Sequence, residues 1–443
     1  MAPVVPGFRG SQRWHEAWRN LAQPSALTLL FLGFGSGMPF LLVSGTLALW
    51  LEETGYSIDE ITILSGAVML YSLKFLWAPL VDHVRFPLLR ELGLRRSWLL
   101  LAQVAVTAGL LGMAAVAPGA TAVFVALTLF TAFAGATQDI LVDAYRIEIA
   151  PPEAQASLAA TYILGYRVAI MVSGGLALIM ADSMGWPLVY ASMAAFMLVP
   201  TITTLLAPEP QTAHAQQQGW LERLREGVVD PFVDFFVRYK GWIGIGLIAF
   251  VLLFKISDQA LSGGLINPFY RAAGFSNSEI GQVSNIYGVW VAVAGAFVGG
   301  VMVARFGLKP SLWAAMILGA ISNLMYVMLA QTHGNLFAFY LAILVENLSG
   351  GLLGTVAVAY LSALVNRNFT ATQYALFSSL VTLPGKVLGM ASGTLVLLFS
   401  AAPAATMAGY SYYFIFTTLA ILPALALFAW LGPRVHLEGE SGK

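Results

Sequence analysis

The chain has 443 residues, of which 58% are hydrophobic and only 10% are charged, and its mean hydropathy is +0.78. This composition excludes an ordinary soluble globular protein and indicates an integral membrane protein. Because 22 Lys and Arg balance 22 Asp and Glu, no net charge favours a nucleic acid as partner. The lack of cysteine excludes disulfides, iron–sulfur clusters and thiolate zinc sites. All five histidines fall in expected loops or tails, so we expect no metal site and no cofactor.

Apolar runs long enough to cross a bilayer recur along the whole chain. A transmembrane helix needs about 20 largely apolar residues. By that criterion the sequence predicts an all-α membrane protein with twelve transmembrane helices, at residues 26–51, 58–81, 97–117, 120–144, 156–182, 187–207, 241–265, 278–304, 311–331, 335–363, 371–400 and 409–432.

One long polar segment interrupts this series between the sixth and the seventh span. We predict that it is a cytoplasmic linker containing an amphipathic helix. The chain then divides into a cytoplasmic amino-terminal segment, a six-helix half, the linker, a second six-helix half and a cytoplasmic tail, at residues 1–25, 26–207, 208–240, 241–432 and 433–443.

The positive charges predict the orientation of the chain. If both termini lie in the cytoplasm, nearly all Lys and Arg outside the spans also face the cytoplasm, and Arg271 alone faces the outside. We therefore expect a multi-pass protein with both termini cytoplasmic.

Two segments of the first half recur in the second half at the same offset. TGYSIDEI at 54–61 matches AGFSNSEI at 273–280, and RVAIMVSGGLAL from Arg167 matches KVLGMASGTLVL from Lys386. Two matches at one offset indicate an internal repeat. The halves are expected to have parallel orientation and to be related by an axis along the membrane normal.

The fourth span ends in a run rich in ionisable residues, ATQDILVDAYRIE at 136–148. Asp139, Asp143 and Arg146 follow each other at i, i+4 and i+7, so a helix places them on one face. Charged groups at membrane depth normally face a protein interior or a water-filled path. This stripe is therefore predicted to line a pathway.

Twelve helices in two parallel halves, with a basic turn after the second and eighth spans, resemble the major facilitator superfamily. That turn reads WAPLVDHV followed by Arg95 and Arg96 in the first half, and GGVMVARFGLKP in the second. A finer resemblance covers most of the first half: FLGFGSGMPFLLVSGTLALWL, YSLKFLWAPLVD and ATQDILVDAYRIE are similar to AmpG-type muropeptide permeases and their relatives, which include acetyl-CoA transporters.

This resemblance implies a secondary active transporter and not an enzyme. AmpG-type proteins import anhydromuropeptides, which cell-wall recycling releases, into the cytoplasm by proton symport. The implied location is the bacterial inner membrane, the implied partners are the substrate, protons and lipid, and a monomer is the default state of this architecture.

Substrate sites in this fold lie near the midplane between the halves, where alternating access rocks one half against the other. Arg167 and Lys386 hold matching places in the repeat and could bind the carboxylates of a peptide stem. The alternative is that each merely neutralises an acid, Arg167 with Asp139 and Lys386 with Glu346. Further candidates for substrate contact, each of which could equally be packing or local pairing, are Lys255, Gln138, Tyr162 and Tyr166.

Proton coupling requires an acid whose proton affinity changes with access. We place Glu346 first, followed by Asp139 and Asp258. An ion-pair gate on the cytoplasmic side is predicted from Lys74, Asp82, Asp143, Arg146 and Arg305, with Arg95, Arg96 and Lys309 nearby. The alternative for Lys74 is a side chain that extends to the membrane interface.

Other functions remain as alternatives. A related carrier could move another anionic or amphipathic solute, such as an acyl-CoA-like molecule, a siderophore or a drug. A membrane-embedded enzyme is disfavoured because the chain has no HExxH motif, no cysteine and no expected intramembrane histidine. A receptor is disfavoured because no soluble segment is longer than residues 208–240.

Overall fold

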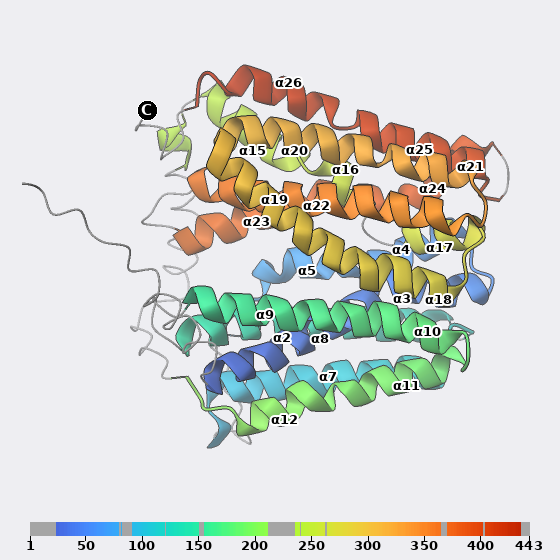
Figure 1. The fold of residues 1–443 in the computed structure, drawn as a ribbon. Coiled ribbons are helices and arrows are strands. Elements are labelled where there is room, and N and C mark those ends of the chain that lie inside the picture. Colours follow the sequence, from blue (N-terminus) through green and yellow to red (C-terminus); the bar gives the residue numbers. More distant parts are fainter. Residues whose placement is uncertain are drawn as a thin grey trace, which may run out of the picture.

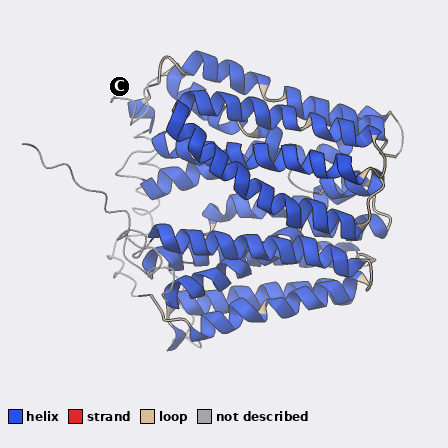
Figure 2. Cartoon of the chain, in the orientation of Figure 1, coloured by secondary structure: helices blue, strands red, loops and turns tan. Residues whose placement is uncertain are grey.

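The computed structural model describes residues 24–78, 81, 91–119, 121–149, 155–210, 235–239, 241–261, 264–364, 370–401 and 404–435. Helices account for most of these residues, and no β-strand occurs among them (Figure 2). Residues 1–23 of the predicted amino-terminal segment, most of the predicted linker helix and Asp82 lie outside the described residues.

The first half contains α2 (Pro24–Leu42), α3 (Gly45–Glu53), α4 (Ile58–Ser65), η1 (Gly66–Met69), α5 (Leu70–Leu73), η2 (Lys74–Leu76), α7 (Leu94–Val116), α8 (Thr121–Glu148), α9 (Gln155–Ile170), η5 (Met171–Leu176), α10 (Ala177–Ala181), α11 (Trp186–Phe196) and α12 (Leu198–Leu206). The second half contains α15 (Trp242–Leu253), α16 (Ile256–Gln259), α17 (Ile266–Ala272), α18 (Asn277–Ile280), η7 (Gly281–Tyr287), α19 (Gly288–Phe306), α20 (Leu308–Ser322), α21 (Leu324–Gln331), α22 (Leu336–Leu364), α23 (Thr370–Met390), α24 (Ser392–Ser400), α25 (Met407–Leu419) and α26 (Leu422–Leu431). Figure 1 shows the helices of the two halves as two bundles, one below the other, with roughly aligned axes.

The predicted all-helical membrane fold is confirmed. Ten helices in the described part are long and apolar enough to cross a membrane, or eleven if the pair Phe377–Met390 and Ser392–Ser400, bent by 42°, counts as one span. The predicted continuous helix over 58–81 is interrupted, because its described residues form α4, η1, α5 and η2 in succession. This segment meets the other half closely: a Cβ added at Gly66 would strike the Met390 side chain. Short 3₁₀ turns are common where a helix is under local strain.

The internal repeat predicted from the sequence has the same local structure in both halves. Ser57 and Ser276 each begin a helix, and their backbone N–H groups donate to the Glu60 and Glu279 carboxylates at 2.9 and 2.8 Å. Both are capping boxes, which satisfy amide groups that a helix start leaves free. The repeat therefore reflects a shared structural unit.

Glycines bring α2 and α9 into backbone contact. A Cβ at Gly37 would lie 2.7 Å from the Tyr166 carbonyl oxygen, and one at Gly165 would strike the Leu30 carbonyl. Small residues allow such close crossings where two membrane helices pack. This crossing fixes α9, which carries Tyr166, against α2.

Gly165→Ala is expected to lower the free energy of unfolding by about 1–3 kcal/mol, because its methyl group has no space between the helices. The measurement is thermal unfolding of the purified protein in detergent. Gly354→Ala is the matched control, since an added Cβ there meets nothing within 4 Å and the better helix propensity of Ala should keep or raise stability. Equal losses in both variants would contradict the close crossing.

Hydrogen bonds and an ion pair join the two halves at the end that the sequence predicts to face outside. Asn277 donates to Glu53 at 2.8 Å, the Arg271 guanidinium lies 3.5 Å from the same carboxylate, and the Ser278 backbone N–H donates to Asp182 at 2.8 Å. We call these five residues the seam. Among the described residues, every hydrogen bond between the halves lies at this end or near the middle of the bundle.

Two π-helical segments face each other beside the seam, η5 in the first half and η7 in the second. Their backbones nearly touch, because a Cβ at Gly281 would lie 2.6 Å from the Gly175 carbonyl oxygen. π-Helical turns occur frequently at functional sites. The halves are thus closed against one another at this end.

Candidate functional site

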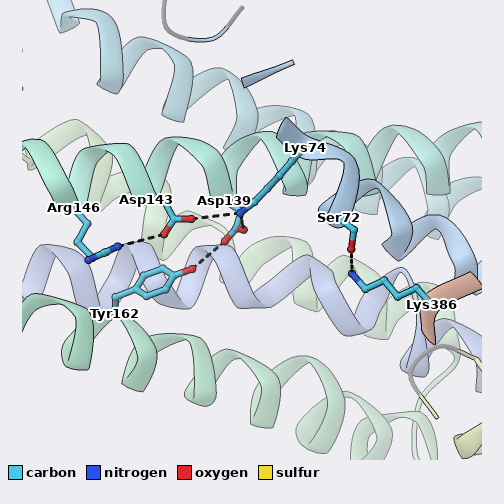
Figure 3. A network of polar contacts seen from close by, with 7 residues as sticks. All are labelled: Ser72, Lys74, Asp139, Asp143, Arg146, Tyr162 and Lys386. Carbon is cyan, nitrogen blue, oxygen red and sulfur yellow. Dashed lines mark hydrogen bonds and ion pairs between the residues drawn. The ribbon is translucent and has the colours of Figure 1, made fainter. Parts of the chain in front are cut away.

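A network of charges connects three helical segments of the first half (Figure 3). The Lys74 amine, at the junction of α5 and η2, forms an ion pair with Asp139 and lies 3.4 Å from Asp143. Tyr162 of α9 donates to Asp139 at 3.0 Å, and Arg146 lies 4.0 Å from Asp143. The predicted stripe on α8 is therefore present, and Lys74 and Tyr162 complete it.

The exposure of this network indicates that it borders water. The side chains of Lys74, Asp139 and Asp143 are 26%, 15% and 41% exposed. Ionised groups that faced lipid would be very costly, so we expect the partly exposed side chains of Lys74 and Asp139, which lie within predicted spans, to face an aqueous space. Lys74 and Arg146 balance the two acids, which keeps the network neutral overall.

Aromatic rings adjoin the network on the side of α2 and α9. The Phe40 ring lies 5.6 Å from that of Tyr71 and 6.5 Å from that of Tyr166, and the Tyr162 ring lies 6.3 Å from Tyr166. The Tyr71 hydroxyl is buried and has no hydrogen-bond partner among the described residues. The sequence indicated only the two tyrosines of α9, because Phe40 and Tyr71 have no distinctive pattern. We call these four residues the aromatic group.

The two cations of the repeat are not neutralised as the alternative interpretation required. Asp139 pairs with Lys74 and not with Arg167, and Lys386 donates to Ser72 and not to Glu346. Arg167 forms no ion pair or hydrogen bond with any described residue.

A second charged group lies in the other half. Lys255 and Asp258 form an ion pair at 3.1 Å within one turn, as their spacing suggested, and Asn347 donates to Glu346 at 2.7 Å. Glu346 is within electrostatic range of Asp258 and within hydrogen-bonding reach of Tyr326. The two predicted coupling acids of this half are thus neighbours.

Gln138 faces away from these groups. The Gln138 side chain is fully buried. It packs against Gly35 of α2 beside Pro200 of α12: a Cβ added at Gly35 would lie 2.7 Å from the Gln138 Nε2 atom and 2.7 Å from the Pro200 ring. In this conformation Gln138 points into the first half, between α2 and α12. Its contact with substrate stays an untested prediction.

The predicted gate residues do not join the halves within the part of the chain that the structure describes. Arg305 is exposed and forms no ion pair with a described residue. Arg95 pairs with Glu148 at 2.6 Å, and Lys309 donates to the Val435 carbonyl at 2.9 Å, so each contacts its own half. Lys74, Asp143 and Arg146 belong to the network with Asp139. The predicted gating role of these residues remains untested.

No group of three or more His, Asp or Glu among the described residues could hold a metal ion. The groups available for chemistry are cations, carboxylates, hydroxyls and aromatic rings. Such groups bind and release a solute or a proton.

Comparisons with known proteins agree with this arrangement. The sequence profile of the Major Facilitator Superfamily matches residues 29–262. The chain is 35% identical over 412 residues to the anhydromuropeptide permease of Escherichia coli, covering 92% of this chain and 80% of that protein. It is 32% identical over 417 residues to the putative transporter AmpG 4 of Rickettsia conorii, covering 92% and 97%.

Solved structures with the same fold include a D-xylose–proton symporter, with a TM-score of 0.70, 16% identity and coverage of 91% of this chain and 96% of the other. A bacterial homologue of the human lysosomal transporter Spinster, in an inward-facing state, has a TM-score of 0.69, 15% identity and coverage of 92% and 96%. At such identities the likeness shows the fold alone. The chain belongs to the major facilitator superfamily, among its AmpG-type permeases, and is a multi-pass membrane transporter.

Proposed function

We propose that this transporter imports anhydromuropeptides into the bacterial cytoplasm by proton symport, as a step of cell-wall recycling. The observation that carries the proposal is the similarity to a protein named anhydromuropeptide permease, which extends over 92% of this chain and 80% of that protein. The protein would lie in the inner membrane with both termini in the cytoplasm and act as a monomer without enzymatic activity.

The chemistry of the site fits a ligand that combines sugars with an acidic peptide. Sugar rings present apolar C–H faces that pack on aromatic rings, and the aromatic group offers four such rings. Peptide carboxylates need cations, for which we propose Arg167, Lys386 and Lys255. Tyr162 and Tyr166 belong to the aromatic group and would contact the sugars.

Proton coupling is assigned to acids that lie beside the substrate path. Glu346 is our first choice because it lies on the membrane-spanning helix α22 close to a second carboxylate, that of Asp258. Asp139 is the next choice, since its pairing with Lys74 could alternate with protonation. A proton bound from outside and released inside would bring substrate with it.

The closed seam supports an inward-facing state of the alternating-access cycle. With the orientation predicted from the positive charges, the seam closes the outer end. Substrate and proton would then leave toward the cytoplasm, and opening of the seam would reset the carrier.

The test is uptake of labelled GlcNAc-anhydroMurNAc-peptide into proteoliposomes, with and without an inward proton gradient. Wild type is expected to accumulate substrate only with the gradient, while Glu346→Gln should lose accumulation and keep exchange of substrate. Glu91→Gln removes an exposed acid and serves as the control. If wild type moves no muropeptide under either condition, the proposal falls, and a screen of other anions on the same vesicles identifies the cargo.

A further inference from the structure

A cation and two hydroxyls meet where the two halves touch near the middle of the bundle. The Lys386 amine of α23 donates to the Ser72 hydroxyl of α5 at 2.7 Å, and the Ser72 and Thr382 hydroxyl oxygens lie 3.0 Å apart. Figure 3 shows Lys386 reaching Ser72, apart from the network around Asp139. Ser72 belongs to the first half, whereas Lys386 and Thr382 belong to the second. We call these three residues the cradle.

Lys386 has no acid to balance its charge among the described residues. Its hydrogen-bond partner, Ser72, is a neutral hydroxyl. The nearest acid in electrostatic terms is Asp139, but Lys74 already forms an ion pair with that carboxylate. Lys74 adds a second positive charge within range of Lys386. An ammonium group inside a membrane protein is normally paired, so this site lacks one negative charge.

The donors of the cradle suit a carboxylate. An ammonium group carries three N–H donors, of which Ser72 accepts one. The Ser72 hydroxyl can turn its hydrogen toward an incoming anion. The Thr382 hydroxyl, which donates to the Ser379 carbonyl at 3.1 Å, would exchange that bond for one to the anion. A carboxylate has two oxygens with about four acceptor positions, which three such donors can occupy.

We propose that Lys386, Ser72 and Thr382 bind a carboxylate of the transported solute and that this anion bonds to both halves at once. The proposal rests on the proposed function and deepens it, because it assigns the acidic part of the cargo to the cradle and leaves the sugars to the aromatic group. An anion held by both halves stabilises the conformation in which they are close together. A solute without the carboxylate would bind more weakly and favour that conformation less.

The test compares binding of the muropeptide with that of the same molecule whose carboxylates are amidated, by calorimetry on protein in detergent. A free acidic peptide and its amide are measured as a second pair of probes. Lys386→Gln is expected to weaken binding of the acids about tenfold to a hundredfold and to leave binding of the amides unchanged. Ser72→Ala and Thr382→Val should each give a smaller loss, again confined to the acids.

Two controls separate binding from structure. Thr418→Val removes a hydroxyl that bonds within its own helix, α25, and should change neither the affinity for the acids nor the affinity for the amides. Lys386→Gln should unfold at the same temperature as wild type or higher, because it removes a charge that has no acidic partner. A lower unfolding temperature, or equal weakening of acids and amides, overturns the cradle.

The outcomes also distinguish the two proposals. If wild type transports muropeptide but Lys386→Gln still prefers acids to amides as wild type does, the proposed carboxylate site is wrong and the proposed function stands. If wild type neither binds nor transports muropeptide but binds the acidic peptide through Lys386, the carboxylate site is supported and the muropeptide assignment is wrong.

Discussion

Lys74→Met, made alone, is expected to lower the free energy of unfolding by about 3 kcal/mol, because it leaves Asp139 and Asp143 partly buried without their shared cation. Adding Asp139→Leu should restore most of this loss, since Asp143 and Arg146 then balance each other. Replacing both members of a buried ion pair by apolar residues is often neutral, whereas removing one is costly. Stability is followed by chemical unfolding in detergent.

Transport should not recover with stability in the double variant. The network would lose two of its four charges, and uptake into proteoliposomes should stay below about a tenth of the wild-type rate. Arg305→Met, which removes an exposed cation without an ion-pair partner among the described residues, is the stability control and should change little. Wild-type uptake by the double variant would mean that the network is only structural.

Gly281→Trp is expected to prevent closure of the halves beside the seam. The new side chain would have to occupy the place of the Gly175 carbonyl, which is backbone and cannot move aside. Overpacking costs about 1–3 kcal/mol, so the ratio of closed to open seam should fall by about fivefold to about 150-fold. The variant should bind substrate from outside and transport little of it.

Spin labels on cysteines introduced at Ser183 and Ala272 would report the distance across the seam. The chain has no natural cysteine, so no background labelling interferes. Gly300→Trp lies on α19, where an added Cβ meets nothing within 4 Å, and should show the wild-type distance distribution. An unchanged distribution in Gly281→Trp would show that the glycine contact does not control closure.

The fold could be predicted from the sequence because its determinants are local or repeated. Apolar length predicts spans, and the recurrence of TGYSIDEI as AGFSNSEI indicated two related halves, which the capping boxes at Ser57 and Ser276 explain. The interruption of the span over 58–81 could not be predicted, because the residues 58–81 form one apolar run and the packing of Met390 against Gly66 brings in a residue of the other half.

The sequence predicted which site residues lie together only where these residues belong to a single helix. The period of α8 placed Asp139, Asp143 and Arg146 together, but Lys74 lies on another segment, and spacing cannot show which acid it meets. We assigned Lys74 to a gate and Asp139 to coupling, and the structure joins them in one ion pair.

Two further features of the structure have simple geometric causes. Gln138 precedes Asp139 in sequence, yet successive residues differ by about 100° around a helix, so the two side chains face different neighbours. The seam was missed because Glu53 and Arg271 are far apart in sequence. The one available indication in the sequence was that Glu53 and Arg271 each lie just before a copy of the repeat, at 54–61 and 273–280.

The seam also bears on how fast this carrier can work. It consists of single hydrogen bonds and one ion pair whose side chains are about 30% exposed, and such contacts contribute about 1 kcal/mol each or less. Every 1.4 kcal/mol added to the barrier of a step slows it about tenfold. In the proposed alternating-access cycle the seam breaks once per turnover, so weak bonds favour rapid turnover. Stronger bonds across the seam would slow the return of the empty carrier to the state that binds substrate.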